Sequence, residues 1–214
     1  MRADLTPEQR AEGTPLIAAA QAFGRFLLWL AARPTIVGLE NVPSTGKVLL
    51  AANHTHNFDG PTLFSVMPRP AGFFVKAEAF VGPIGPFLRS IGQIPIKRGV
   101  PQREPIATAL GSLAAGGLVG IFPEGSRGAG DVAEVRHGIA YLAVRSGAPV
   151  VPVAFVGTRA LMPRRSIRRP KIRIVIGEPV HIAAGPASRS AVSDAAEKIR
   201  VAMSALVTSA GAEQ

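Results

Sequence analysis

From residue 34 onward, short runs rich in Val and Ile alternate with stretches patterned as helices. This alternation is typical of α/β proteins, in which helices cover a largely parallel sheet. At 214 residues the chain is long enough to bury a substantial core without crosslinks, and it contains no Cys. We therefore predict a single α/β domain with a largely parallel central sheet flanked by helices.

The individual elements follow from the same pattern. The predicted strands cover residues 35–39, 48–53, 73–75, 94–97, 118–122, 150–156 and 171–176, and the predicted helices cover residues 62–67, 80–90, 104–115 and 132–146. A final helix has an apolar stripe that recurs every three or four residues, formed by Val192, Ala195, Ile199, Met203 and Leu206. We expect this helix to pack on the core and to end before Gly211.

Residues 16–32 are the most apolar segment near the N-terminus, and Arg25 lies near their midpoint. A membrane-spanning helix needs about 20 apolar residues, and a central Arg costs about 3 kcal/mol on insertion. We therefore favour an amphipathic helix in the membrane interface over one that crosses, with an ordinary core-packing helix as the alternative. Asp4, Glu8 and Glu12 stand where a secretory signal has its basic region, so no signal is predicted.

Arginine dominates the charge balance. The net charge is +10, 19 of the 24 basic residues are Arg, and residues 135–177 contain nine basic residues and no acid. Anionic partners are therefore expected, because Arg suits forked hydrogen bonding of phosphate. One Trp and one Tyr do not support a base-stacking surface, so we predict no nucleic-acid partner.

The first chemistry-bearing cluster, residues 53–59, follows directly on a predicted buried strand. Its His54 and Asp59 can meet only if the chain turns between them, because five residues on a helix place them on different faces. Gly60 and Pro61 allow such a turn, with Asp59 as a helix cap. A carboxylate held there leaves one imidazole nitrogen as a general base, although a structural His–Asp pair remains the alternative.

The second cluster, residues 121–128, is a strand end that runs into a glycine-bearing loop. Gly125 and Gly128 let backbone N–H groups approach an anion, and Arg127 can bind phosphate with two parallel hydrogen bonds. A tight turn with a solvent-facing Arg is the alternative. Ser126 is not a nucleophile elbow, because Glu124 stands where that motif needs Gly.

Four blocks at strand ends follow one another in a fixed order: His-x4-Asp at 54–59, Gly-x-Ile-x-Ile-x-Arg at 92–98, Phe-Pro-Glu-Gly-Ser-Arg at 122–127 and Val-Pro-Val at 151–153. Together they resemble the motifs of the glycerolipid acyltransferases, specifically 1-acylglycerol-3-phosphate acyltransferases of the PlsC type. The resemblance covers about residues 35–180. Lys76 and Glu78 resemble a further family feature, whereas His56 stands where the family usually has Ser.

The resemblance implies that His54 removes a proton from the acceptor hydroxyl while Asp59 holds the tautomer of its imidazole. The activated alcohol then attacks an acyl thioester, without a cofactor, a metal or an acyl-enzyme. Acceptor binding is assigned by the resemblance to Arg98, Glu124, Gly125, Arg127 and Lys76. Pro152 belongs to the block that lines the acyl side.

The resemblance further implies that acyl-CoA or acyl-carrier protein donates the acyl group. The expected acceptor is lysophosphatidate, and the expected product is phosphatidate, an intermediate of phospholipid biosynthesis. Another lysolipid or a glycolipid is the alternative acceptor, because an enzyme that acylates it needs similar motifs. The resemblance also implies that the protein binds an anionic membrane surface and has a peripheral or monotopic location at the cytoplasmic face. Residues 1–34 then form an interfacial segment, and residues 35–214 form the acyltransferase catalytic domain.

Two other functions are the alternatives. His54-Thr55-His56 followed by an acid resembles the start of a metallo-β-lactamase metal site, but Asp59 is one residue late and no His follows it. Only His137 and His181 remain, too few for two metals. A basic protein that merely coats membranes is the rival without catalysis.

Overall fold

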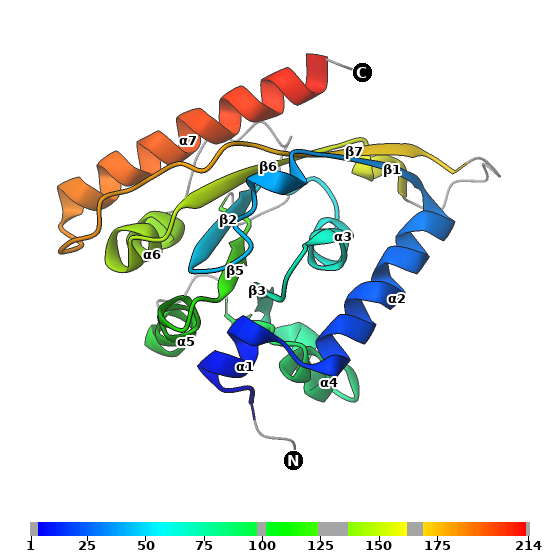
Figure 1. Ribbon diagram of the computed structural model, residues 1–214, viewed down its shortest axis with the longest axis horizontal. Coiled ribbons are helices and arrows are strands. Elements are labelled where there is room, and N and C mark those ends of the chain that lie inside the picture. The colour runs from blue at the N-terminus through cyan, green and yellow to red at the C-terminus, as the bar shows by residue number, and fades with distance from the viewer. Residues whose placement is uncertain (1–3, 98–101, 124–136, 162–168, 213–214) are drawn as a thin grey trace.

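The computed structural model describes residues 4–97, 102–123, 137–161 and 169–212. Its centre is a seven-stranded sheet in the order β1-β7-β6-β2-β5-β3-β4. Neighbouring strands are parallel except β6 and β7, which are antiparallel. Helices cover both sides of the sheet (Figure 1). The prediction of one α/β domain with a largely parallel sheet is confirmed.

The strands are β1 (Arg33–Val37), β2 (Val48–Ala52), β3 (Ala71–Lys76), β4 (Ile94–Ile96), β5 (Leu118–Ile121), β6 (Val150–Val156) and β7 (Lys171–Ile176). The α-helices are α1 (Pro7–Glu12), α2 (Pro15–Ala31), α3 (Asp59–Val66), α4 (Ile84–Ser90), α5 (Arg103–Ala114), α6 (His137–Ser146) and α7 (Arg189–Ala212). Short 3-10 turns are η1 (Leu39–Asn41), η2 (Ala77–Phe80) and η3 (Thr158–Leu161). Every predicted strand is present, with ends shifted by at most two residues.

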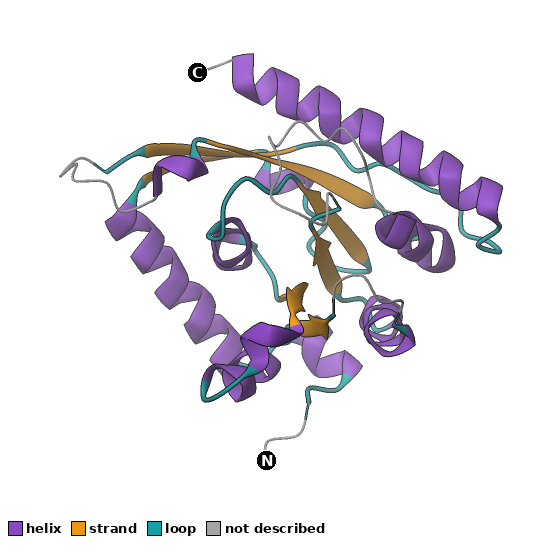
Figure 2. Ribbon diagram, turned by 180° about the vertical axis from the view of Figure 1, so that it is seen from behind, coloured by secondary structure: helices purple, strands orange, loops and turns teal. Residues whose placement is uncertain are grey.

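The central strand β2 separates two hydrophobic cores. Val48, Leu50 and Ala52 join the core shared with α2 and α3, whereas Leu49 and Ala51 join the core shared with α5, α6 and α7. This division follows from the alternation of side chains along a strand. Figure 2 shows, from behind, the helices that cover the two faces of the sheet. Because β2 is buried on both sides, only its ends can present polar groups.

Three predicted helices differ from the structure. The predicted helix at 80–90 is divided into η2 and α4, because Gly82 has a positive φ of 58° and Pro83 follows it. The helix predicted at 62–67 begins earlier, at Asp59. The last helix continues through Gly211, which lies inside α7 rather than after it. A glycine alone does not end a helix whose neighbours are good helix formers.

The N-terminal helix α2 is docked on α3 by one face. Ile17 and Leu28 are buried, and the side-chain amide of Gln21 donates to the carbonyls of Phe64 and Arg69, at 3.0 and 3.2 Å. Its opposite face is exposed and apolar, so one helix combines core packing with a free apolar face. By length and composition alone, the helical stretch from Pro7 to Ala31 is apolar enough to cross a membrane.

Candidate active site

The site begins where β2 ends. Asn53 is buried, and its side chain exchanges two hydrogen bonds with the backbone of Phe155 in β6: Asn53 Oδ1 accepts from the N–H at 2.7 Å and Nδ2 donates to the carbonyl at 3.3 Å. These bonds continue the β2–β6 pairing by one residue beyond the strand. The chain therefore leaves the sheet at a fixed point, and the residues that follow it are held in place.

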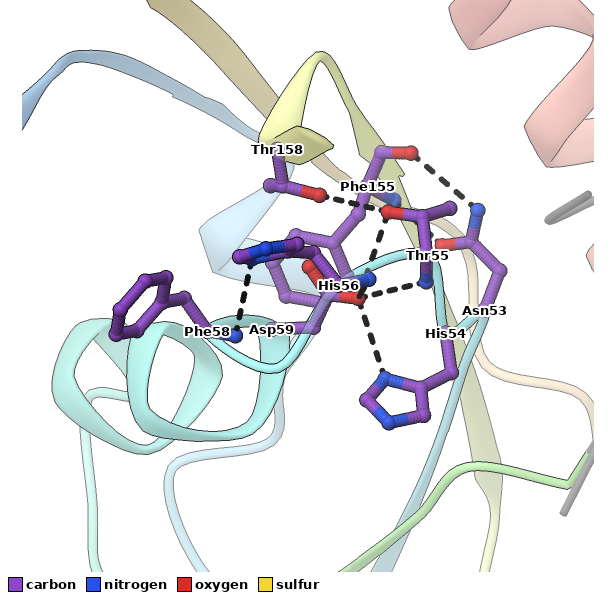
Figure 3. Close-up of polar contacts among 8 residues, drawn as sticks. All are labelled: Asn53, His54, Thr55, His56, Phe58, Asp59, Phe155 and Thr158. Atoms are coloured by element: carbon purple, nitrogen blue, oxygen red, sulfur yellow. Dashed lines mark hydrogen bonds and ion pairs between the residues drawn. The ribbon is translucent and has the colours of Figure 1, made fainter. Parts of the chain in front are cut away.

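His54 and Asp59 meet directly after this point. Nδ1 of His54 lies 3.2 Å from Oδ2 of Asp59. The same oxygen accepts the backbone N–H of Thr55 at 2.7 Å and that of His56 at 2.6 Å. Figure 3 shows the three contacts converging on one carboxylate oxygen. When Nδ1 carries the proton and donates it to Asp59, Nε2 is the nitrogen that can act as a base.

The turn that joins the pair lies earlier than predicted. The N–H of Asp59 donates to the carbonyl of His56 at 3.1 Å, so the chain turns before Asp59 rather than at Gly60-Pro61. Asp59 is also the first residue of α3 and not its cap. Its carboxylate reaches back to the turn, because the amides of residues 55 and 56 point at it. The turn and the carboxylate thus stabilise each other.

Asp59 is fully buried, and among the described residues its other oxygen, Oδ1, has no hydrogen-bond partner. A buried carboxylate is stable only when hydrogen bonds or a cation compensate its charge. The hydrogen bonds that Oδ2 accepts therefore stabilise the charge of Asp59. In the part of the chain that the structure describes, no cluster of three His, Asp or Glu side chains is arranged to hold a metal ion.

A second hydroxyl supports the turn. Oγ1 of Thr55 lies 2.7 Å from Oγ1 of Thr158, which is fully buried in η3. Oγ1 of Thr55 also lies 3.5 Å from Oδ2 of Asp59. The hydroxyl pair therefore links the end of β6 to the turn that carries the His–Asp pair.

His56 lies apart from the pair. Its ring packs near the ring of Phe58, with 5.2 Å between centroids, and its Nδ1 accepts from the N–H of Phe58 at 3.4 Å. Figure 3 shows the rings of His54 and His56 on opposite sides of the Asp59 carboxylate. His56 therefore does not share Asp59 through its side chain.

His54 opens onto a cavity of about 960 Å³. The ring of Phe122 packs against the imidazole with 4.5 Å between centroids. Most of the other lining side chains are apolar, and they come from the helices α2 to α6 and from the strands β3, β4 and β5. Lys76 and Lys97 also line this cavity. The base therefore faces a largely apolar chamber with two cationic side chains in its wall.

The predicted site residues fall into three groups. His54, Asp59 and Lys76 lie in or against the cavity wall. Pro152 is buried within β6, opposite Ala51, and is not among the described residues that line the cavity. The remaining four lie outside the described residues: Arg98, Glu124, Gly125 and Arg127.

Several residues of the site were not predicted. Phe122 is the first residue of the block 122–127, but no role was predicted for it; its position directly before the glycine-bearing segment was the available signal. Asn53 had a comparable signal, since it directly follows the buried run. Lys97 also had a signal, because it stands at the end of the strand in the block 92–98, directly before Arg98. Thr158 had none, because nothing in the sequence relates residue 158 to the turn at residues 54–59.

Comparison with known proteins agrees with this geometry. The acyltransferase family model matches residues 33–156, more than half of the chain. The chain is 33% identical over 144 residues to a 1-acyl-sn-glycerol-3-phosphate acyltransferase of Bacillus subtilis (strain 168), covering 66% of this chain and 71% of that protein. It is 32% identical over 154 residues to a chloroplastic enzyme of the same name from Arabidopsis thaliana, covering 68% of this chain but only 43% of that protein.

The fold is similar to a solved structure. The 1-acyl-sn-glycerophosphate acyltransferase PlsC of Thermotoga maritima matches with a TM-score of 0.69 and 24% identity, over 91% of this chain and 79% of that one. Together with the sequence matches, this places the chain among enzymes that transfer acyl groups. It belongs to the acyltransferase family.

Proposed function

We propose that the enzyme transfers a fatty acyl group from an acyl thioester to the free hydroxyl of 1-acylglycerol 3-phosphate, giving phosphatidate. The observation that carries the proposal is the His54–Asp59 pair, 3.2 Å apart, in the wall of a largely apolar cavity. The acceptor is supported by the names of the relatives from Bacillus subtilis and Arabidopsis thaliana. Another lysolipid or a glycolipid is the alternative acceptor.

The geometry supports general-base chemistry. Nε2 of His54 takes the proton of the acceptor hydroxyl while the hydroxyl oxygen attacks the thioester carbonyl. Asp59 stabilises the imidazolium that forms, and Phe122 limits the motion of the ring. The tetrahedral intermediate then expels the thiolate, which receives the proton from His54. The step forms one ester and one thiol and leaves no acyl group on the protein.

Acceptor recognition is proposed to rest on cations. Lys76 lines the cavity and supplies one positive charge. Arg98 and Arg127, with the loop residues Glu124 and Gly125, are proposed to complete the phosphate site. Arg suits this role because its guanidinium forms two parallel hydrogen bonds to one phosphate.

We propose acyl-CoA or acyl-carrier protein as the donor and no cofactor. We also propose a peripheral or monotopic location on the cytoplasmic face, on an anionic membrane surface. The exposed apolar side chains of α2 support this location; they are Phe23, Phe26, Leu27, Trp29 and Leu30. We also propose that the Arg-rich segment 163–170 adds electrostatic attraction to this surface. Within it, Arg169 lies over the ring of Trp29, 4.7 Å from its centroid, and donates to the carbonyl of Ala32 at the end of α2. Arg164, Arg165 and Arg168 lie outside the described residues.

The test of the proposed function is a transfer assay. Purified enzyme is supplied with radiolabelled acyl-CoA or acyl-carrier protein and with a panel of acceptors: lysophosphatidate, glycerol 3-phosphate, a neutral lysolipid and a glycolipid. We expect label in phosphatidate when lysophosphatidate is present. Label in another acceptor alone would contradict the proposed acceptor, and no transfer to any of them would contradict the function.

A further inference from the structure

A second exposed apolar surface lies on α4 and the turn before it. We define the α4 patch as Val81, Ile84 and Phe87, whose exposed fractions are 70%, 60% and 46%. No charged residue occurs between residues 79 and 88. Large apolar side chains this exposed and this close together mark a surface that contacts an apolar partner.

The backbone around the patch is built to hold these side chains outward. Gly82 has a positive φ of 58°, and Pro83 caps α4. A Cβ on Gly85 would lie 2.2 Å from the carbonyl oxygen of Phe80, so the turn is closely packed against η2. The guanidinium of Arg89 lies over the ring of Phe80, 5.2 Å from its centroid. The apolar side chains are therefore presented by a fixed turn and not by a loose loop.

The α4 patch and the exposed face of α2 border the same cavity. Phe87 from α4 and Phe23 from α2 are each exposed to solvent and each line the cavity that His54 also lines. In Figure 1, α4 and the N-terminal half of α2 both lie on the side of the molecule away from α7. A substrate chain that leaves the cavity between the two helices therefore passes two apolar rims.

We propose that the α4 patch is a second membrane contact, which enters the same leaflet of an anionic bilayer as α2. The inference rests on the proposed function: the acyl chains of a lysolipid stay out of water only if both rims of the cavity enter the bilayer. Burial of exposed apolar side chains provides the affinity. The net charge of +10 suits an anionic surface. Arg33 is exposed at the start of β1, and Arg25 is exposed on α2 while one of its nitrogens donates to the carbonyl of Ser65 at 2.9 Å.

Fluorescence quenching tests the contact without relying on activity. Trp29 is the only Trp, so Trp29→Phe provides a silent background. A single Trp is then introduced as Val81→Trp or, as a matched control, as Val201→Trp. Val201 is 52% exposed on α7, remote from α4 in both ribbon views (Figures 1 and 2). Each protein is mixed with anionic vesicles whose lipids carry bromine on their acyl chains.

We expect the emission of the Val81→Trp protein to fall by more than half, whereas that of the Val201→Trp protein changes little. Equal quenching of the two would overturn the proposal. Native Trp29 reports α2 separately, so a membrane contact of α2 alone gives quenching of Trp29 without quenching at position 81. Because no step uses substrate, quenching at position 81 is independent of which acceptor the enzyme acylates.

Charge substitution gives a second measurement. Val81→Asp and Ile84→Asp should each weaken binding to anionic vesicles about tenfold, since a carboxylate is costly to place among acyl chains. Val201→Asp should leave binding unchanged. Turnover of a short-chain, monomeric lysophosphatidate should be the same in all three, which shows that the proteins are folded and competent. Unchanged vesicle affinity with slower turnover from acyl-carrier protein alone would assign the patch to a protein partner and overturn the membrane contact.

Discussion

Oδ2 of Asp59 lies 3.2 Å from Nδ1 of His54 and also accepts the backbone N–H groups of Thr55 and His56. One oxygen thus orients the imidazole and closes the turn that carries it. A substitution at position 59 therefore has two separable effects, on the charge beside His54 and on the conformation of the turn. Asn at position 59 removes the charge but keeps an acceptor for the turn, whereas Ala removes both.

Asp59→Asn should lower kcat by about 10² to 10⁴-fold, because the amide oxygen can still accept from the turn but no longer compensates the imidazolium. The acceptor KM should change little. Asp59→Ala should also lower the free energy of unfolding, by about 1–3 kcal/mol, because two backbone donors lose their acceptor. Asp194→Asn, an exposed Asp on α7, is the control. Steady-state kinetics with urea unfolding measures both effects, and a fully active Asp59→Asn enzyme would contradict the assigned role.

Thr158→Val should lower the free energy of unfolding by about 1–2 kcal/mol. The substitution keeps the shape of the side chain but removes the hydroxyl that lies 2.7 Å from Oγ1 of Thr55. We also expect a several-fold fall in kcat without a change in either KM, because Thr55 belongs to the turn between His54 and Asp59. Thr158→Ser keeps the hydroxyl and should restore most of both. A Val variant as stable and as active as the native protein would contradict a role for the hydroxyl pair.

Gly24→Ala should loosen the docking of α2 on α3. An added Cβ would lie 2.0 Å from Oγ and 3.0 Å from Cβ of Ser65, so either the Ser65 hydroxyl gives up its hydrogen bond to the carbonyl of Pro61 or the two helices separate. We expect a loss of about 1–3 kcal/mol in the free energy of unfolding, as for other overpacked contacts. Gly211→Ala is the matched control, because its Cβ meets nothing within 4 Å inside α7 and should stabilise slightly. Denaturant titration measures the free energy of unfolding of both variants. Equal stability of the Gly24→Ala and Gly211→Ala proteins would contradict close packing at Gly24.

Lys76→Ala, Arg98→Ala and Arg127→Ala should each raise the KM for lysophosphatidate far more than the KM for the acyl donor, because these cations are proposed to hold the acceptor phosphate. Arg→Lys should restore only part of the affinity, since a point charge does not reproduce two parallel hydrogen bonds. Kinetics with each substrate varied in turn measures the difference. Equal effects on both substrates would assign these residues to the fold or to the donor.

The fold was predictable because its signals are local. The apolar strands of a parallel sheet are continuous in sequence, and β6 and β7 were predicted with their observed ends. The division between η2 and α4 was missed, because the apolar pattern across Gly82 and Pro83 suits a continuous helix. Helix α1 was missed as well. Although short, it has a capping box at Thr6, and burial of Arg10, whose guanidinium donates to the carbonyl of Gly92 at 2.5 Å, fixes it to the domain.

The site was predictable only where its residues are close in sequence. His54 and Asp59 stand in one turn, so their types and spacing indicated the pair. The contact between Thr55 and Thr158 joins residues 103 positions apart, and no local pattern relates them. Arg169 donates to the carbonyl of Ala32 and lies over Trp29, contacts that no local pattern indicated. Its partner is an unsatisfied helix-end carbonyl, which becomes available only once α2 has ended beside it.

The central claim is that His54 is the base that activates a lysophosphatidate hydroxyl. The most direct test compares His54→Ala with His56→Ala, because both residues lie in the same turn and only His54 contacts Asp59 through its side chain. Phosphatidate formed from labelled donor and lysophosphatidate is measured for each, with vesicle binding as a check on folding. We expect that His54→Ala loses at least about 10³-fold in kcat, that adding Asp59→Asn lowers kcat little further, and that His56→Ala retains most activity. An active His54→Ala enzyme, or an inactive but folded His56→Ala enzyme, would contradict this claim.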